Sequence, residues 1–192
     1  MAITVHELAQ SLEKITLTGA CNAAKGALKI SNALYDSTKP LKVKLAEGLD
    51  LTCPWEPGVY KGTGLEDRLG IVFRATEEIY DAFAALEHHC REILEADDVK
   101  NVSQLWSSCL RSDKFGKSIR AKINVKGNRC ADFWDADNSP SSAPMEYRNL
   151  PINAICQVRG VYIQKTTIGL LIDVVSLQYG NALGDADKQS PF

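Results

Sequence analysis

Two long, mainly apolar runs near the C-terminal end constrain the fold more than any other feature of the sequence. The first spans residues 155–163 and the second spans residues 169–179, and a short connection through Lys165, Thr166 and Thr167 separates them. Neither run contains proline, so either one can occupy a central position in a sheet. The two runs therefore predict a long C-terminal β-hairpin.

Shorter segments predict further strands, and one segment predicts a helix. The shorter strands are expected at residues 13–18, 27–34, 41–45, 69–73, 118–125 and 130–134. Apolar residues recur at helical spacing over residues 75–96, and Thr76 is placed to cap this helix. A second, short helix is expected over residues 101–110.

These elements predict a mainly β protein of the α+β class. Five or more strands with a helical insertion at about residues 75–110 fit a five-stranded barrel of the oligonucleotide-binding (OB) type, although other small barrels fit the same count. The 192 residues suffice for one such domain, expected over residues 1–180 and followed by a flexible tail over residues 181–192.

No apolar run reaches the ~18 residues of a membrane span, and the N-terminus lacks a signal-peptide pattern. We therefore expect an intracellular protein, in the cytoplasm or nucleus of a host cell, that is neither secreted nor bound to a membrane.

Charge is distributed unevenly, although the formal net charge is only −2. Residues 77–98 contain eight acidic residues and one basic residue, whereas residues 111–129 contain seven basic residues and one acidic residue. Such a basic segment attracts polyanions even in a protein of low net charge. The alternative interpretation is a solvated strand face without a ligand.

The sequence lacks the motifs of common enzymes. It contains no glycine-rich nucleotide motif, no HExxH zinc motif and no GxSxG nucleophile motif. The His-His-Cys run at residues 88–90 is consecutive on the expected helix, so its side chains cannot converge on one metal. Glu66 and Asp67 directly precede Arg68 and could bind a divalent ion, but charge pairing around a turn is the simpler interpretation. The six widely spaced cysteines are expected to be mostly buried free thiols. We expect no catalytic residue, no cofactor and no metal.

Binding of a single strand requires cations along the phosphates and aromatic faces for the bases. Arg120 and Lys122 alternate with apolar residues, so we expect their side chains to point away from the core. Trp55 and Tyr60 lie in a loop rich in proline and glycine and are the aromatic pair expected to be exposed. Four aromatic residues around the basic segment are expected to be mostly core: Trp106, Phe115, Phe133 and Trp134. The candidate nucleic-acid-binding residues are Lys114, Lys117, Arg120, Lys122, Arg159, Tyr162, Lys165, Trp55, Tyr60 and Lys61. An alternative track follows Lys42, Lys44 and the 55–61 loop.

The hairpin carries a recognisable pattern. The sequence LPI at residues 150–152 leads into VRGVY at residues 158–162 and TIGLLIDVVSL at residues 167–177. With a helix placed before a basic strand, this pattern resembles the single-stranded DNA-binding proteins of short-tailed coliphages and of large DNA viruses of algae. The resemblance is clearest over residues 100–192 and covers residues 27–99 only by the order of elements. It implies an OB-type barrel, sequence-independent binding, a viral protein of DNA replication or recombination, and a homodimer.

The C-terminal segment DADKQSPF is a second point of similarity, because it is a short acidic tail that ends in Phe192. The resemblance implies that such a tail recruits replication proteins. This tail departs from the pattern in strength, since it has only two acidic residues and Lys188 opposes them.

The leading hypothesis is therefore a non-enzymatic, sequence-independent single-stranded DNA-binding protein. The main alternative is a barrel-shaped interaction or structural protein that binds no nucleic acid, which the balanced net charge and the apolar hairpin would suit. RNA binding and a nuclease activity are further alternatives.

Overall fold

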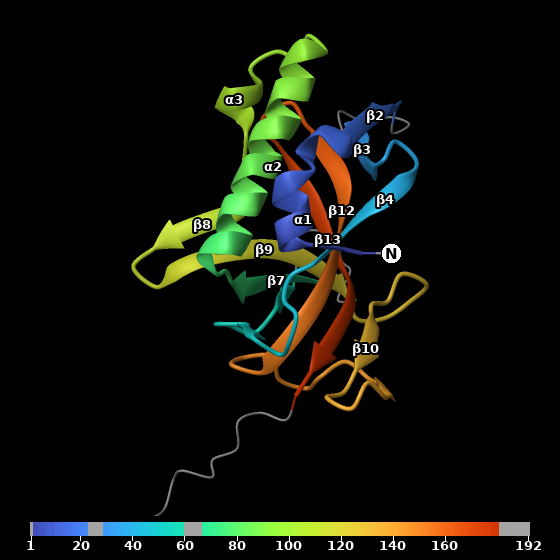
Figure 1. Ribbon diagram of the computed structural model, residues 1–192, viewed down its shortest axis with the longest axis vertical. Coiled ribbons are helices and arrows are strands. Elements are labelled where there is room, and N and C mark those ends of the chain that lie inside the picture. The colour runs from blue at the N-terminus through green and yellow to red at the C-terminus, as the bar shows by residue number, and fades with distance from the viewer. Residues whose placement is uncertain (1, 23–28, 60–66, 181–192) are drawn as a thin grey trace, which may run out of the picture.

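The computed structural model describes residues 2–22, 29–59 and 67–180 (Figure 1). Within these ranges the chain is mostly β-strand with a few helices, as the sequence predicted. The expected tail at residues 181–192, and the candidate residues Tyr60 and Lys61, lie outside the described residues. None of the described helices is long and apolar enough to cross a membrane.

The described strands all belong to one sheet, and the helices lie against it. In chain order the strands are β1 (Ile3–Thr4), β2 (Ile15–Asn22), β3 (Lys29–Tyr35), β4 (Lys39–Lys44), β5 (Leu51–Thr52), β6 (Gly58–Val59), β7 (Arg68–Arg74), β8 (Leu110–Asp113), β9 (Gly116–Asn124), β10 (Asp132–Trp134), β11 (Pro140–Ser141), β12 (Pro151–Ile163) and β13 (Ile168–Tyr179). The helices are α1 (Val5–Gln10), the 3-10 helix η1 (Leu12–Lys14), α2 (Glu77–Ala96) and α3 (Val102–Leu105).

The predicted C-terminal hairpin is confirmed, and it forms the centre of the sheet. β12 and β13 pair in antiparallel fashion from Ile152 opposite Tyr179 to Ile163 opposite Ile168. β12 also pairs with β3, β4 and β5, and β13 pairs in parallel with β9 and β10. The hairpin therefore organises most of the sheet.

The predicted five-stranded OB-type barrel is not confirmed. Instead, the strands form a 13-stranded sheet whose main order is β1-β4-β3-β12-β13-β9-β7-β6, with the remaining strands branching from this path. The sequence did not predict β1, β5, β6 or β11, each of which has two residues. Strands this short show no alternation, so only their pairing partners define them.

The predicted long helix is confirmed as α2. Its N-terminus is capped by Thr76, whose hydroxyl accepts a hydrogen bond from the Ile79 amide. The second helix was expected over residues 101–110, but α3 ends at Leu105. Leu110 instead begins β8, because residues 110–113 pair with β9 and this pairing overrides the local helical tendency.

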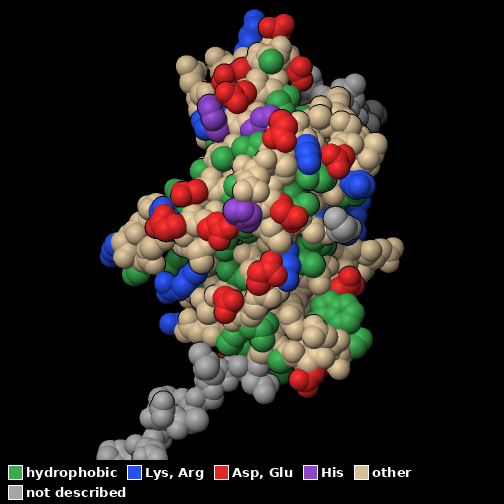
Figure 2. Space-filling view, viewed as in Figure 1, with side chains coloured by type: hydrophobic (Ala, Val, Ile, Leu, Met, Phe, Trp, Pro, Cys, Tyr) green, Lys and Arg blue, Asp and Glu red, His purple; other side chains and the backbone are tan. Residues whose placement is uncertain are grey.

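Five strands, the two of the hairpin and three beside it, alternate between a core side and an outward side. The residues on the core side are Leu41, Val43, Ile71, Phe73, Ile119, Ile123, Cys156, Val158, Ile172 and Val174, and each is at most 3% exposed. They share one apolar cluster with the buried face of α2. Figure 1 shows that α1 and α2 cover one side of the sheet, and Figure 2 shows many Asp and Glu side chains on the same face of the molecule. The opposite side of β4, β12, β13, β9 and β7 is here called the outward side.

Candidate nucleic-acid interface

A line of polar side chains crosses four neighbouring strands on the outward side. Gln157 of β12 lies opposite Lys42 of β4 and opposite Asp173 of β13. Asp173 in turn lies opposite Lys122 of β9. Residues that lie opposite one another point to the same side of a sheet, so these four residues form one line, here called the central row.

Asp173 is the centre of a charged cluster on this row. Its side chain is only 7% exposed, although it points to the outward side. Nη2 of Arg68 donates to Oδ1 of Asp173 at 2.8 Å, and Nη1 of Arg159 donates to Oδ2 at 3.1 Å. The two arginine side chains are 23% and 34% exposed. Two guanidinium groups therefore surround a carboxylate that solvent barely reaches.

Lys122 adds a third cation to the cluster. The pKa of its ammonium group is lowered, first by burial and second by the charge of Arg68, while Asp173 acts in the opposite direction. A desolvated cation beside another cation is stabilised by an added anion. The cluster of three cations and one carboxylate is therefore suited to hold a further anion such as a phosphate.

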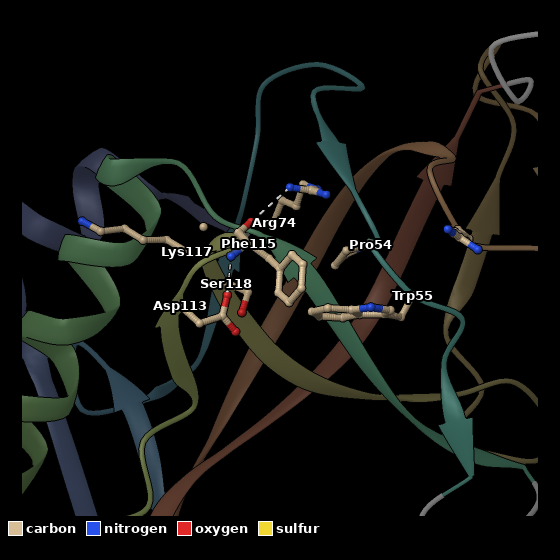
Figure 3. Close-up of a pocket in the computed structure, with 9 residues that line it drawn as sticks. Pro54, Trp55, Arg74, Asp113, Phe115, Lys117 and Ser118 are labelled. Atoms are coloured by element: carbon tan, nitrogen blue, oxygen red, sulfur yellow. Dashed lines mark hydrogen bonds between the residues drawn. The ribbon is translucent and has the colours of Figure 1, made fainter.

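A cleft with two exposed aromatic side chains opens at one end of β7 and β9 (Figure 3). Trp55 is 47% exposed and Phe115 is 60% exposed, and Figure 3 shows the two side chains next to one another. The residues that line this aromatic cleft are Pro54, Trp55, Arg74, Asp113, Phe115, Gly116, Lys117, Ser118 and Arg148. Lys117 of this lining pairs with Glu77 of α2, so the positive charge of the cleft comes from Arg74 and Arg148, and Asp113 is its one acidic side chain.

The position of Trp55 is fixed through its neighbour Glu56. The Glu56 carboxylate accepts hydrogen bonds from the amide of Tyr147, at 3.0 Å to each oxygen, and from the amide of Arg148 at 2.7 Å. A β-bridge between Cys53 and Arg148 adds a second connection. Hydrogen bonds to a charged acceptor are among the stronger ones. The loop that presents Trp55 is therefore attached to the segment that supplies Arg148 to the cleft.

Phe115 lies in the turn between β8 and β9. The Phe115 amide donates to Oδ1 of Asp113 at 2.8 Å, and Gly116 follows with a φ of +102°, a conformation that favours glycine. Nη1 of Arg74 donates to the Phe115 carbonyl at 3.3 Å. Nζ of Lys114 lies 5.0 Å from the centre of the Phe115 ring. The turn therefore holds the ring outside the core and among cations.

The aromatic cleft and the central row lie along the same two strands. Arg74 lies opposite Ser118 in the cleft, and Gly70 lies opposite Lys122 in the central row. Ser118 and Lys122 are four residues apart on β9, which is about 13 Å, and this even spacing puts both on the outward side. One extended ligand can therefore contact both.

Some of the predicted site residues are brought together by the fold. Lys122 and Arg159 meet at Asp173, Trp55 lines the aromatic cleft, and Lys114 lies beside the ring of Phe115. These residues are distributed over four separate strands and loops. Their common location on the outward side follows from the sheet order.

Lys117 and Arg120, which were predicted to belong to the phosphate track, both have partners within the protein. The Lys117 ammonium pairs with Glu77 of α2 and lies 4.5 Å from the ring centre of Tyr80. Figure 3 shows this side chain extending away from Trp55, toward the helices. Arg120 does point to the outward side, but its Nη2 donates to the carbonyl oxygen of Ser108. Alternation along a strand predicts the side of the sheet, but it does not reveal such partners.

Tyr162 and Lys165 lie farther along the hairpin. Tyr162 is opposite Gly169, and a Cβ atom on Gly169 would lie 2.9 Å from the Tyr162 hydroxyl. Lys165 is exposed in the connection between β12 and β13, six residues or about 20 Å beyond Arg159. Both residues therefore lie toward the end of the hairpin rather than at Asp173.

The sequence analysis missed Arg68, Arg74, Arg148 and Asp173 as site residues and placed Phe115 in the core. Phe115 had a usable signal, because it directly precedes Gly116 just before a predicted strand, and a glycine at such a place favours a turn. Asp173 also had a signal, since it is the one charge inside the apolar run TIGLLIDVVSL. Its pairing with Arg68, 105 residues away in the sequence, could not be read from any local pattern.

The described residues form no metal site, and their buried thiols are not activated. No group of three or more His, Cys, Asp or Glu side chains there could hold a metal ion. Cys53, Cys90, Cys109 and Cys156 are buried, as predicted, whereas Cys130 is exposed. Burial raises the pKa of Cys53 and of Cys90 to about 12, so both thiols are neutral near pH 7.

No model of a known protein family matches the sequence, and no curated protein is significantly similar to it. Several solved structures do match. The single-stranded DNA-binding protein of bacteriophage Enc34, in a C-terminally truncated form, aligns with a TM-score of 0.47 and 14% identity over 86% of this chain and 94% of its own. The same protein in complex with single-stranded DNA aligns with a TM-score of 0.45 and 14% identity over 85% and 94% of the two chains. The single-stranded DNA-binding protein gp2.5 of bacteriophage T7 aligns with a TM-score of 0.47 and 10% identity over 72% and 94%. These three solved structures are thus of phage single-stranded DNA-binding proteins.

Proposed function

We propose that the protein binds single-stranded DNA without sequence preference, as a protein of DNA replication or recombination. The observation that carries this proposal is the aromatic cleft, in which exposed Trp55 and Phe115 lie next to each other among basic side chains. Aromatic faces stack on any base, and cations attract any phosphate, so this combination fits a single strand of any sequence.

The ligand class follows from the geometry of stacking. In a duplex the faces of the bases are already covered by their neighbours, so exposed aromatic rings cannot stack on them. In a single strand the bases can turn toward the rings. The aromatic cleft therefore favours a single strand over a duplex.

The central row supplies the second part of the proposed interface. The Asp173 cluster holds three cations and one carboxylate, and Lys42 lies on the same row two strands away from Asp173. The face over α2, in contrast, carries many acidic side chains (Figure 2). A polyanion is therefore expected on the outward side, crossing from the aromatic cleft to the central row.

The salt dependence of binding tests this path. Replacing Lys42 and Lys122 together with glutamine is expected to weaken binding to oligo-dT and to flatten the plot of log affinity against log salt by about 1.4, because each lost phosphate contact on a single strand removes about 0.7 from the slope. Fluorescence anisotropy of a labelled oligo-dT at several salt concentrations measures both quantities.

The matched control replaces two exposed lysines outside this face, Lys14 and Lys100, with glutamine. This control removes the same net charge, so its slope should stay close to that of the parent. Equal slopes for the two double variants would place the phosphates elsewhere on the molecule.

A further inference from the structure

Asp173 is an unexpected residue for a surface that binds DNA. It carries the same sign of charge as a phosphate, and it lies in the middle of the central row. Burying a carboxylate is unfavourable unless cations and hydrogen bonds compensate for the lost water. A neutral side chain at this strand position would avoid that penalty. In the structure, this carboxylate binds the side chains of Arg68 and Arg159.

Its partners are two long side chains that would otherwise be mobile. The oxygens of Asp173 are divided between them, with Oδ1 accepting from Arg68 and Oδ2 accepting from Arg159. A guanidinium group has five N–H donors in a fixed plane, and each of these two arginines uses one of them on Asp173. The two guanidinium groups are thus held in one place, and each keeps N–H donors that do not bind Asp173.

The cluster remains positive in spite of the carboxylate. Its one carboxylate, Asp173, lies among three cations, Arg68, Arg159 and Lys122. The site therefore still attracts an anion. Without Asp173, three cations would face one another in a half-buried position and repel. The two arginine side chains would then separate, and a phosphate would have to order them again on binding, which lowers affinity.

We propose that Asp173 is a positioning residue for DNA binding, which holds the guanidinium groups of Arg68 and Arg159 together as a preformed seat for one backbone phosphate. This inference rests on the proposed function and adds a specific role for an acidic residue within it. Its consequence is contrary to simple charge counting, because removal of a negative charge from the interface weakens the binding of a polyanion.

The test is Asp173→Asn, which keeps the shape of the side chain and removes its charge. We expect oligo-dT to bind about tenfold more weakly to this variant, since two rotamer-rich side chains must then be ordered on binding. The salt slope should not fall, because no cation is lost. Glu92→Gln, on the exposed face of α2, makes the same change in net charge away from the interface and should bind like the parent.

Two further outcomes separate the inference from the proposed function. Tighter binding of Asp173→Asn, with a slope steeper by about 0.7, would show that Asp173 acts only as a repelling charge and would overturn the inference alone. A parent protein that fails to bind oligo-dT at low salt would overturn the proposed function itself.

A second variant covers the case in which Asp173→Asn does not fold. Arg159→Lys keeps the positive charge but loses the planar guanidinium group with its several N–H donors. The Arg159 side chain is 34% exposed in the parent. We expect weaker binding at an unchanged salt slope. Unchanged affinity would show that only the charge at this position matters and would overturn the positioning role.

Discussion

Replacing Trp55 and Phe115 together with alanine is expected to weaken oligo-dT binding by roughly 100-fold, because stacking of one base on one aromatic ring contributes ~1–3 kcal/mol. Both side chains lie outside the core, with 47% of Trp55 and 60% of Phe115 exposed, so the free energy of unfolding should change little. The salt slope should also be preserved, since no cation is removed. Anisotropy of labelled oligo-dT and denaturation by urea measure the two effects separately.

Met145→Ala is the matched control for this pair. Met145 is fully exposed and does not line the aromatic cleft, so its loss removes apolar surface without removing a stacking face. We expect it to bind like the parent. A double variant that binds as well as Met145→Ala would exclude the aromatic cleft as the site of base stacking.

Gly160→Ala is expected to destabilise the fold by on the order of 4 kcal/mol or more, or to prevent folding. Gly160 lies at an irregularity in the pairing of β12, opposite Asn32 of β3, with a φ of +149°. A Cβ atom there would lie 1.8 Å from the carbonyl oxygen of Ser31, which is backbone and cannot move aside alone. Because Gly160 follows Arg159, the same change also displaces the Arg159 side chain, which binds Asp173. Urea denaturation monitored by circular dichroism measures the effect.

Gly127→Ala is the comparison for this variant. Gly127 also has a positive φ, of +81°, but no atom lies within 4 Å of the position that a Cβ would take. Replacing it with alanine should therefore lower the free energy of unfolding only by the cost of a positive φ in a residue with a Cβ atom, about 1–2 kcal/mol. Similar losses at both positions would show that β3 can move away from β12, contrary to the close packing described above.

The elements that could be predicted from the sequence are those whose pattern is local and long. The hairpin β12–β13 and helix α2 have many turns or alternations each, so their apolar periodicity identified them. Helix α1 had a shorter signal that was missed. Thr4 and Glu7 form a capping box around its first turn, a spacing that can be recognised in the sequence.

The candidate site was predictable in its kind but not in its geometry. Alternation placed Lys122 on the outward side, and a loop rich in proline and glycine placed Trp55 at the surface. The partners of these residues depend on which strands lie side by side. Arg68 reaches Asp173 only because β7, β9 and β13 are adjacent in the sheet, and Lys117 turns to Glu77 only because α2 packs beside β9. Such contacts arise from the tertiary fold, which no local pattern specifies.

The most direct measurement of the central claim is a comparison of two ligands under one set of conditions. Labelled oligo-dT and a hairpin duplex of equal length are titrated with the protein at the same moderate salt concentration, and anisotropy gives both affinities. We predict that oligo-dT binds much more tightly, because only a single strand offers free base faces to Trp55 and Phe115. Equal affinity for the two ligands, or tighter binding of the duplex, would contradict single-strand recognition by the aromatic cleft.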